Sequence, residues 1–308
     1  NTLLRIGTRG SDLALVQARS IADALIKNMP GLETEIVPIR TRADRMQDMA
    51  IVELGGKGVF VKEIESELLA GNIDIAVHSM KDVPAELPEG LEIVAYPKRE
   101  DPRDVLISRG NIKFEELPRK AKIGTGALRR RMQLLNIMPD LEMIPIRGNI
   151  QTRIRKIESE QLDGVILAAA GMRRMGLHSH VSQFISTDVM LPAAGQGVLG
   201  IEIRRENEQL CERLDFLNDP DTVTEITAER AFLTRLGGGC QVPIAGYARL
   251  HGKMLQIKGM VGTPDGERIV TETLRGPREE AQAMGEALAE AILAKGGREI
   301  LAIASVSC

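Results

Sequence analysis

Short runs of apolar, often β-branched residues alternate with amphipathic stretches of helix length through about the first two thirds of the chain. Residues 3–6 form the first run, and Ser11 after it predicts a helix N-cap. Across residues 15–29 the apolar positions recur at steps of three and four, which predicts one buried helix face. Residues 35–39 and 73–77 continue the pattern as strands. This alternation is typical of an α/β fold with largely parallel sheets.

Part of the pattern occurs twice. Residues 122–125, Lys-Ile-Gly-Thr, echo residues 5–8, Arg-Ile-Gly-Thr. Residues 163–168, which precede a glycine-containing loop, echo residues 74–77. Because both echoes fall at the ends of predicted strands, we interpret the chain as containing two similar α/β domains.

The predicted organisation is two doubly wound α/β domains followed by a smaller α+β domain. The first domain takes residues 1–98 and 198–216, because the run after Gly195-Gln196-Gly197 has the composition of a strand that returns to it, and the second takes residues 103–192. Two chain crossings between these domains would permit closure around a ligand.

The third domain is predicted at residues 220–308, where the pattern changes. Short strands and a Pro264-Asp265-Gly266 turn predict a three-stranded antiparallel sheet covered by helices. The expected elements are a helix at 222–236, strands at 245–250, 254–261 and 268–274, and a helix at 279–295.

Composition narrows the classes of function. The 308 residues include 43% hydrophobic and 27% charged residues, which fits a globular protein, and their formal net charge is −3. No Trp, two Tyr and five Phe leave few aromatic side chains for stacking on bases, and no apolar run approaches the length of a membrane-spanning helix. We therefore expect no nucleic-acid partner and no membrane span.

Three cysteines, Cys211, Cys240 and Cys308, are an odd number and lie far apart in the sequence. This spacing argues against a disulfide framework and favours a reducing, cytoplasmic location. The four histidines show no ligand spacing with a carboxylate or a cysteine, so we expect no metal site.

Positive charge is concentrated in the predicted second domain. Residues 120–175 hold eleven Lys and Arg against five Asp and Glu, a local charge of +6. Arg129, Arg130 and Arg131 open a predicted helix, and Arg147 and Arg153 flank the start of the next one. Helix N-termini and bidentate guanidinium groups both suit carboxylates or phosphates. A polyanion pocket and a solvated basic face both remain open, and Arg9 at the matching turn of the first domain favours the pocket.

Nucleotide binding is not indicated. Gly55-Gly56-Lys57-Gly58 lacks the spacing of a phosphate-binding loop, and no Gly-x-Gly-x-x-Gly follows a predicted strand.

Two further residues could carry chemistry. Asp82, beside Lys81, lies in a loop at the carboxyl end of a predicted strand, where an acid could relay protons or stabilise a developing cation. The alternative is an aspartate that only caps the following turn. Cys240 follows three glycines that could bring a thiol into a tight space, although a lone cysteine can equally be inert.

Several motifs together resemble the porphobilinogen deaminase (hydroxymethylbilane synthase) family along nearly the whole chain. The most specific are His78-Ser79-Met80-Lys81-Asp82-Val83-Pro84 and Gly238-Gly239-Cys240-Gln241-Val242-Pro243. The others are Gly7-Thr8-Arg9-Gly10-Ser11-Asp12-Leu13-Ala14-Leu15, Gly55-Gly56-Lys57-Gly58-Val59-Phe60, Arg99-Glu100-Asp101-Pro102-Arg103-Asp104, Leu128-Arg129-Arg130, Arg147-Gly148-Asn149 and Leu191-Pro192-Ala193-Ala194-Gly195-Gln196-Gly197.

The resemblance implies a transferase of porphyrin and haem biosynthesis that condenses four porphobilinogen molecules into hydroxymethylbilane and releases ammonia. It implies a dipyrromethane cofactor held by a thioether to Cys240, and Asp82 as the catalytic acid. It also implies a monomer.

The family's binding positions are carried over to this sequence as implied roles. Those for the cofactor are Cys240, Lys81, Thr125, Arg129, Arg130, Arg153 and Gln196, and those for the substrate are Arg9, Ser11, Arg147, Arg153, Arg174 and Phe60. The chain departs from the family at Gly126 and Ala127, where many members carry two serines. One or two hydroxyl contacts to a cofactor carboxylate are then missing, and the arginines are expected to carry the binding without them.

Two other functions fit parts of the pattern. Two similar α/β domains with two crossings also describe periplasmic-binding-protein-like solute binders, so a non-enzymatic binder of a polycarboxylate is the main alternative. A thiol hydrolase that uses Cys240 is a third. A covalent dipyrrole on Cys240 would distinguish the first function from both.

Overall fold

The computed structural model describes residues 2–41, 58, 61–238 and 242–306. The chain divides into two compact units, one of residues 1–100 with 198–223 and one of residues 101–197 with 224–308. The predicted division into three domains, with its boundaries, stays a prediction.

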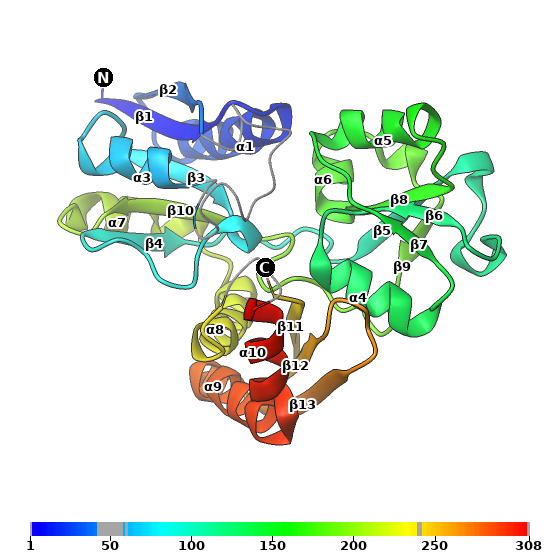
Figure 1. The fold of residues 1–308 in the computed structure, drawn as a ribbon. Coiled ribbons are helices and arrows are strands. Elements are labelled where there is room, and N and C mark those ends of the chain that lie inside the picture. The colour runs from blue at the N-terminus through cyan, green and yellow to red at the C-terminus, as the bar shows by residue number, and fades with distance from the viewer. Residues whose placement is uncertain (1, 42–57, 59–60, 239–241, 307–308) are drawn as a thin grey trace. The chain divides into compact units, whose positions relative to one another are not determined.

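The first unit contains a mixed sheet with helices on both faces (Figure 1). Within the described residues its order is β2-β1-β3-β10-β4, and β10 is antiparallel to both of its neighbours. The strands are β1 (Thr2–Arg9), β2 (Leu32–Ile39), β3 (Ile75–Ser79), β4 (Leu91–Ala95) and β10 (Leu199–Arg204). The strand predicted after the Gly195-Gln196-Gly197 turn is β10, and it lies in this sheet.

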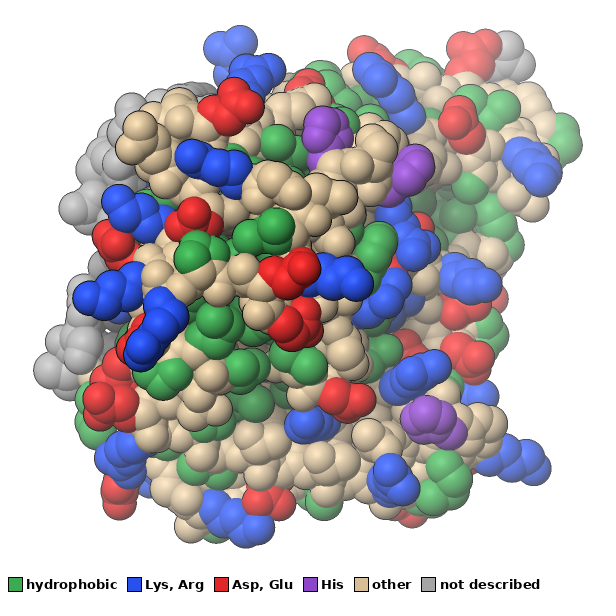
Figure 2. Space-filling view, turned by 90° about the vertical axis from the view of Figure 1, so that its right-hand side faces the viewer, with side chains coloured by type: hydrophobic (Ala, Val, Ile, Leu, Met, Phe, Trp, Pro, Cys, Tyr) green, Lys and Arg blue, Asp and Glu red, His purple; other side chains and the backbone are tan. Residues whose placement is uncertain are grey.

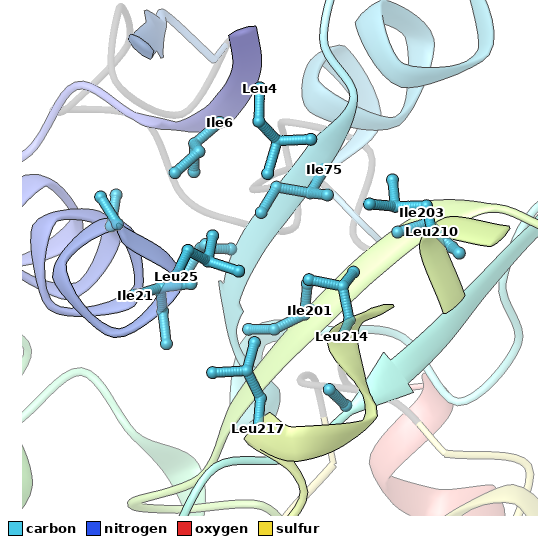
Figure 3. Packing of buried hydrophobic residues seen from close by; sticks show 14 of the residues in the cluster. Leu4, Ile6, Ile21, Leu25, Ile75, Ile201, Ile203, Leu210, Leu214 and Leu217 are labelled. Atoms are coloured by element: carbon cyan, nitrogen blue, oxygen red, sulfur yellow. The ribbon is translucent and has the colours of Figure 1, made fainter. Parts of the chain in front are cut away.

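Aliphatic side chains from both faces of this sheet form its core. Helix α1 (Asp12–Asn28) and helix α7 (Glu208–Leu214) pack on one face, where Ile21 and Leu25 meet Leu214 and the strand residues (Figure 3). Helix α3 (Lys62–Leu69) packs on the other face. Ile64 and Leu68 lie on its buried face, whereas Phe60, just before it, lies outside the described residues.

The second unit contains a sheet of the same plan. Among its described residues the order is β7-β6-β8-β5-β9, and β5 is antiparallel to its neighbours. The strands are β5 (Asp104–Ser108), β6 (Lys122–Gly124), β7 (Glu142–Ile144), β8 (Gly164–Ala168) and β9 (Gln183–Ile185). Helix α4 (Leu128–Ile137) contributes to the core on one face, and α5 (Ile150–Ser159) and α6 (Ala169–Arg174) contribute on the other.

The echo found in the sequence is a structural repeat. The backbone N–H of Asp74 donates to the Arg5 carbonyl at 2.9 Å, and the N–H of Asp163 donates to the Lys122 carbonyl at 2.8 Å. Each aspartate side chain also accepts from the N–H of its partner residue, at 2.8 and 2.7 Å. The two strand orders confirm the predicted pair of similar doubly wound α/β sheets. The matching hydrogen bonds show that the repeat extends to individual residues.

The same unit also contains the predicted antiparallel sheet. Among the residues described, β11 (Ile244–His251), β12 (Met254–Gly262) and β13 (Ile269–Pro277) pair in sequence order. Helices α8 (Pro220–Arg235), α9 (Ala281–Ile292) and α10 (Arg298–Val306) accompany it (Figure 1). The sequence predicted one helix over 279–295. The chain breaks at Gly296, directly after that range, where a φ of +103° suits glycine, and α10 follows as a helix that the sequence did not predict.

Candidate active site

Asp82 lies on a short 3-10 helix, Met80–Asp82, that continues directly from β3. The helix is fixed at its start, because the N–H of Met80 donates to the Val198 carbonyl at 2.9 Å and the Met80 side chain is buried. Lys81 and Asp82 themselves are half-buried. A cation and a carboxylate are therefore held side by side in the chain at the carboxyl end of a sheet strand, the edge where α/β proteins commonly bind ligands.

The turn after β1 carries the next two predicted residues. Arg9 ends the strand and is half-buried. Ser11 is the N-cap of α1, and its hydroxyl accepts a hydrogen bond from the N–H of Ala14 at 3.4 Å. The predicted N-cap is confirmed, and the role of both residues toward a substrate stays a prediction.

Arg129 and Arg130 meet at one buried carboxylate, that of Asp104 at the start of β5. The distances from Arg129 are 2.6 Å between Nη1 and Oδ2 and 3.1 Å between Nη2 and Oδ1. Arg130 donates to Oδ1 from Nη2 at 2.7 Å and from Nε at 3.1 Å. All three side chains are at most 7% exposed. We call these residues, with Gln196, the arginine cluster.

Gln196 completes the arginine cluster. Its Oε1 accepts from Arg129 at 2.8 Å, and its Nε2 donates to Asp104 Oδ1 at 3.1 Å and to the Pro102 carbonyl at 2.6 Å. The structure thus brings together three residues that the sequence predicted for the cofactor site. It also adds Asp104, which sequence reasoning missed. The only signal was an acidic residue at the start of an otherwise apolar strand.

The arginine cluster has an excess of positive charge. Burial alone would raise the pKa of Asp104, but the charges and hydrogen bonds of Arg129 and Arg130 outweigh it and hold that pKa well below its usual range. Burial also lowers the pKa of Arg130, against the stabilising charge of Asp104. Two guanidinium groups share one carboxylate, so the cluster carries a net charge of +1 in a place where charge is costly. An anion brought to it would be stabilised.

The positively charged residues of the second domain do not all lie on its surface, because Arg129 and Arg130 are buried. On the face drawn in Figure 2, Lys and Arg side chains are interspersed with Asp and Glu. Arg131 is exposed and lies apart from the arginine cluster, because its Nε donates to the Pro264 carbonyl at 3.3 Å in the turn before β13. Arg131 is therefore directed away from Arg129 and Arg130, since successive helix residues point in different directions.

The other predicted arginines of the second unit lie in or beside the helices that pack on its α/β sheet. Arg153, in α5, donates from Nε to the Gly148 carbonyl at 2.8 Å. Arg174, at the end of α6, donates from Nη2 to the Gly197 carbonyl at 2.8 Å. Arg147 follows β7 and is half-buried. Each has a defined place, and their roles toward a ligand stay predictions.

The turn after β6 contains Gly126 and Ala127, the two positions at which the chain departs from the family's serines. Thr125 is buried, and its hydroxyl accepts from the N–H of Ala127 at 3.2 Å. A Cβ at Gly126 would lie 2.8 Å from the Ile146 carbonyl oxygen, closer than such contacts allow. Ala127 is the N-cap of α4 and offers no side-chain oxygen to it. Position 126 therefore excludes a serine unless the Ile146 backbone moves.

The third sheet contacts the second through a buried carboxylate. Glu229 of α8 accepts from the N–H of Gly195 at 2.6 Å and from the N–H of Ala248 at 2.8 Å. It thereby joins the turn that carries Gln196 to β11. Helix α8 ends just before Cys240, and both Cys240 and Phe60 lie outside the described residues.

Two searches confined to the described residues gave negative findings. No helix there is long and apolar enough to cross a membrane. No three His, Cys, Asp or Glu side chains there are grouped as metal ligands.

Comparison with known proteins decides the family. Residues 4–212 match the model of the porphobilinogen deaminase dipyrromethane cofactor binding domain, and residues 223–294 match the model of the porphobilinogen deaminase C-terminal domain. The chain belongs to the porphobilinogen deaminase family. This porphobilinogen deaminase family member is 54% identical to the porphobilinogen deaminase of Syntrophus aciditrophicus over 97% of both chains. It is 53% identical to that of Geotalea uraniireducens over 97% of this chain and 94% of that one.

Among solved structures, a periplasmic binding protein of Salmonella typhimurium aligns with a TM-score of 0.41 and 16% identity, covering 70% of this chain and 92% of that one. The periplasmic-binding-protein-like fold of this family member rests on its own strand order, in which each sheet has one antiparallel strand next to its edge.

Proposed function

We propose that this porphobilinogen deaminase family member is a transferase that condenses porphobilinogen stepwise into hydroxymethylbilane, with release of ammonia at each addition. The observation that carries the proposal is the match of both family domains in order, with about half of all residues identical to named porphobilinogen deaminases over nearly the whole chain. The polycarboxylate binder and the thiol hydrolase have no comparable support.

The residues of the second unit fit a dipyrromethane cofactor. Porphobilinogen units carry acetate and propionate groups, and the arginine cluster has one positive charge more than it neutralises. Arg129 and Arg130 would bind such carboxylates, with Arg153 and Thr125 as further donors in the same unit. The resemblance to the family implies one more cofactor-binding residue, Lys81, in the first unit. When bound through a thioether to Cys240, the dipyrromethane supplies the pyrrole to which new units are added.

Asp82 would act as the general acid of the reaction. Its carboxyl group would transfer a proton to the amino group that leaves as ammonia, and its carboxylate would then stabilise positive charge on a pyrrole nitrogen. Lys81 would hold a carboxylate beside it. Arg9, Ser11, Arg147 and Arg174 would bind and orient the side chains of the incoming substrate.

We also propose that the protein acts as a monomer in a reducing cytoplasm. The odd number of cysteines supports the reducing compartment. Size-exclusion chromatography with light scattering tests the monomer, and a mass twice that of the chain would contradict it.

The proposed function is tested by incubating the purified protein with porphobilinogen. We expect one ammonia released for each porphobilinogen consumed, together with a linear tetrapyrrole product. The control is Cys240→Ser, which removes the thioether anchor and should abolish turnover. Saturable binding of porphobilinogen without release of ammonia would instead identify a binding protein and overturn the proposal.

A further inference from the structure

A buried pair of polar side chains lies behind the Asp82 loop and has no part in the function proposed above. His78 of β3 and Glu202 of β10 are joined by a 2.8 Å contact between Nε2 and Oε2, and their side chains are 3% and 0% exposed. Helix α3 packs on this side of the sheet and brings Glu65 and Lys62 near the pair. Burial and the charge of Glu202 raise the pKa of Glu65 to about 7.

The strand that carries Glu202 also fixes the start of the Asp82 loop. The carbonyl of Val198, just before β10, accepts the N–H of Met80. The Met80 side chain packs over Gly200, where a Cβ would lie 2.2 Å from the Met80 sulfur. The position of Lys81 and Asp82 therefore depends on how β10 is registered against β3.

The pairing of β10 with β4 is irregular. It shifts between Ile201 and Glu202, so a bulge interrupts that ladder. A slip of β10 by one residue against β3 would move every side chain to the opposite face. It would separate Glu202 from His78, so the directional 2.8 Å contact between these two side chains opposes such a slip.

The second sheet shows that the fold itself does not need this pair. The bond from Met80 to Val198 has a counterpart in the bond from the Ala169 N–H to the Arg103 carbonyl, also 2.9 Å long. Counting from these bonds, Leu167 takes the place of His78 and Ile107 takes the place of Glu202. Both are at most 4% exposed. An apolar pair thus fills the same position in a sheet of the same order.

We propose that the His78–Glu202 pair is a positioning device for the Lys81–Asp82 loop, acting by locking the register of β10 against β3. Polar groups are costly to bury, and the second sheet has Leu and Ile at the matching positions, so the fold alone does not account for this pair. This inference rests on the proposed function only in giving Asp82 a catalytic role.

The test exchanges the pair for its counterpart, in the double variant His78→Leu/Glu202→Ile. Replacing both partners avoids leaving one charge buried alone, so the thermal midpoint should stay within a few degrees of the unchanged protein. We expect kcat for porphobilinogen to fall at least about tenfold while KM changes less than about threefold, with rates normalised to covalent cofactor content.

Two single variants sharpen the result. His78→Gln retains an N–H donor toward Glu202 and should keep kcat within about threefold. Glu65→Gln is the matched control, because it alters a neighbouring buried carboxyl group that belongs to neither strand. It should keep kcat within about twofold.

A readout independent of turnover separates this inference from the proposed function. In the double variant the amide of Met80 should exchange its hydrogen at least about tenfold faster, because its bond to Val198 is loosened. If the unchanged protein proves inactive, the proposed function fails and amide exchange still tests the pair. The inference is overturned if the folded double variant keeps both kcat and Met80 protection, or if its activity falls only as much as its folded fraction.

Discussion

The two α/β sheets follow one plan but carry different residues at matching positions. After β3 the chain presents Lys81 and Asp82, whereas the two matching positions after β8 are Ala170 and Gly171. At the start of the antiparallel strand the difference is reversed, because the first sheet has the apolar Leu199 where the second has Asp104. The comparison teaches that the sheet order fixes where a site can form, and that a few residues at strand ends decide which chemistry each sheet serves.

The largest effect is expected in the loop after β3, which carries Lys81 and Asp82, whereas the matching positions after β8 are uncharged. Asp82→Asn should lower turnover of porphobilinogen about 100- to 10,000-fold, the range typical for loss of a general acid or base. Thermal stability should be nearly unchanged, since Asp82 is only half-buried and the substitution keeps its size. The control is Asp23→Asn on the exposed face of α1, and equal activity in both variants would remove Asp82 from the mechanism.

The corresponding substitution in the second sheet is made at Asp104, and it is expected to change stability. Asp104→Asn leaves two buried guanidinium groups without their counter-ion and should lower the free energy of unfolding by about 3 to 5 kcal/mol. Asp140→Asn is the control in the same unit, because Asp140 pairs with Arg119 at the surface at 3.0 Å and should cost less than about 1 kcal/mol. Urea denaturation measures both. A loss at Asp104 no larger than that at Asp140 would contradict the account of the arginine cluster.

The buried carboxyl groups of the two sheets should respond oppositely to pH. Burial raises the pKa of Glu65 from its ordinary 4.5 to about 7, so the folded state holds a proton that the unfolded state has lost. Between these values the folded state binds more protons, and its stability therefore falls as pH rises, then levels off above about pH 7. The low pKa of Asp104 contributes stability at neutral pH that is lost only in strong acid.

Glu65→Gln should remove the contribution of Glu65. The variant should gain stability relative to the unchanged protein as pH rises from about 4 to about 8, by on the order of 3 kcal/mol in total. Thermal midpoints measured across this range check it. A constant difference between the two proteins would show that Glu65 does not titrate in this window.

The smallest effects are expected at the two helix starts. Ser11 caps α1, whereas the corresponding N-cap of α4 is Ala127. Ala127→Ser should stabilise the protein by about 1 kcal/mol. Gly126→Ser should destabilise it by about 1 to 3 kcal/mol, because its Cβ would meet the Ile146 carbonyl. Each variant is the control for the other, because both place a serine in the same turn. If both raised or both lowered the free energy of unfolding, the geometry of this turn would be contradicted.

The sequence predicted the sheets and the repeat because their signals are local. Alternating runs, the Ser11 cap and the short echo at residues 122–125 each lie within one element and its turn. The break at Gly296 lies where the predicted helix over 279–295 ends, and only the helix that follows it, α10, was missed.

The buried ion pairs could not be predicted from the same signals. Asp104 and Arg129 are 25 residues apart, and His78 and Glu202 are 124 residues apart. Nothing in the spacing of such residues indicates a contact, since it arises only when the antiparallel strands β5 and β10 are inserted into their sheets. Family resemblance identified Arg129, Arg130 and Gln196, but the carboxylate that holds them together required the structure.

The most direct test of the central claim is the intact mass of the denatured protein, followed by peptide mapping. The account predicts a covalent dipyrromethane adduct on every active chain, located on the peptide that contains Cys240. A preparation that converts porphobilinogen to hydroxymethylbilane while its Cys240 thiol is unmodified would contradict it.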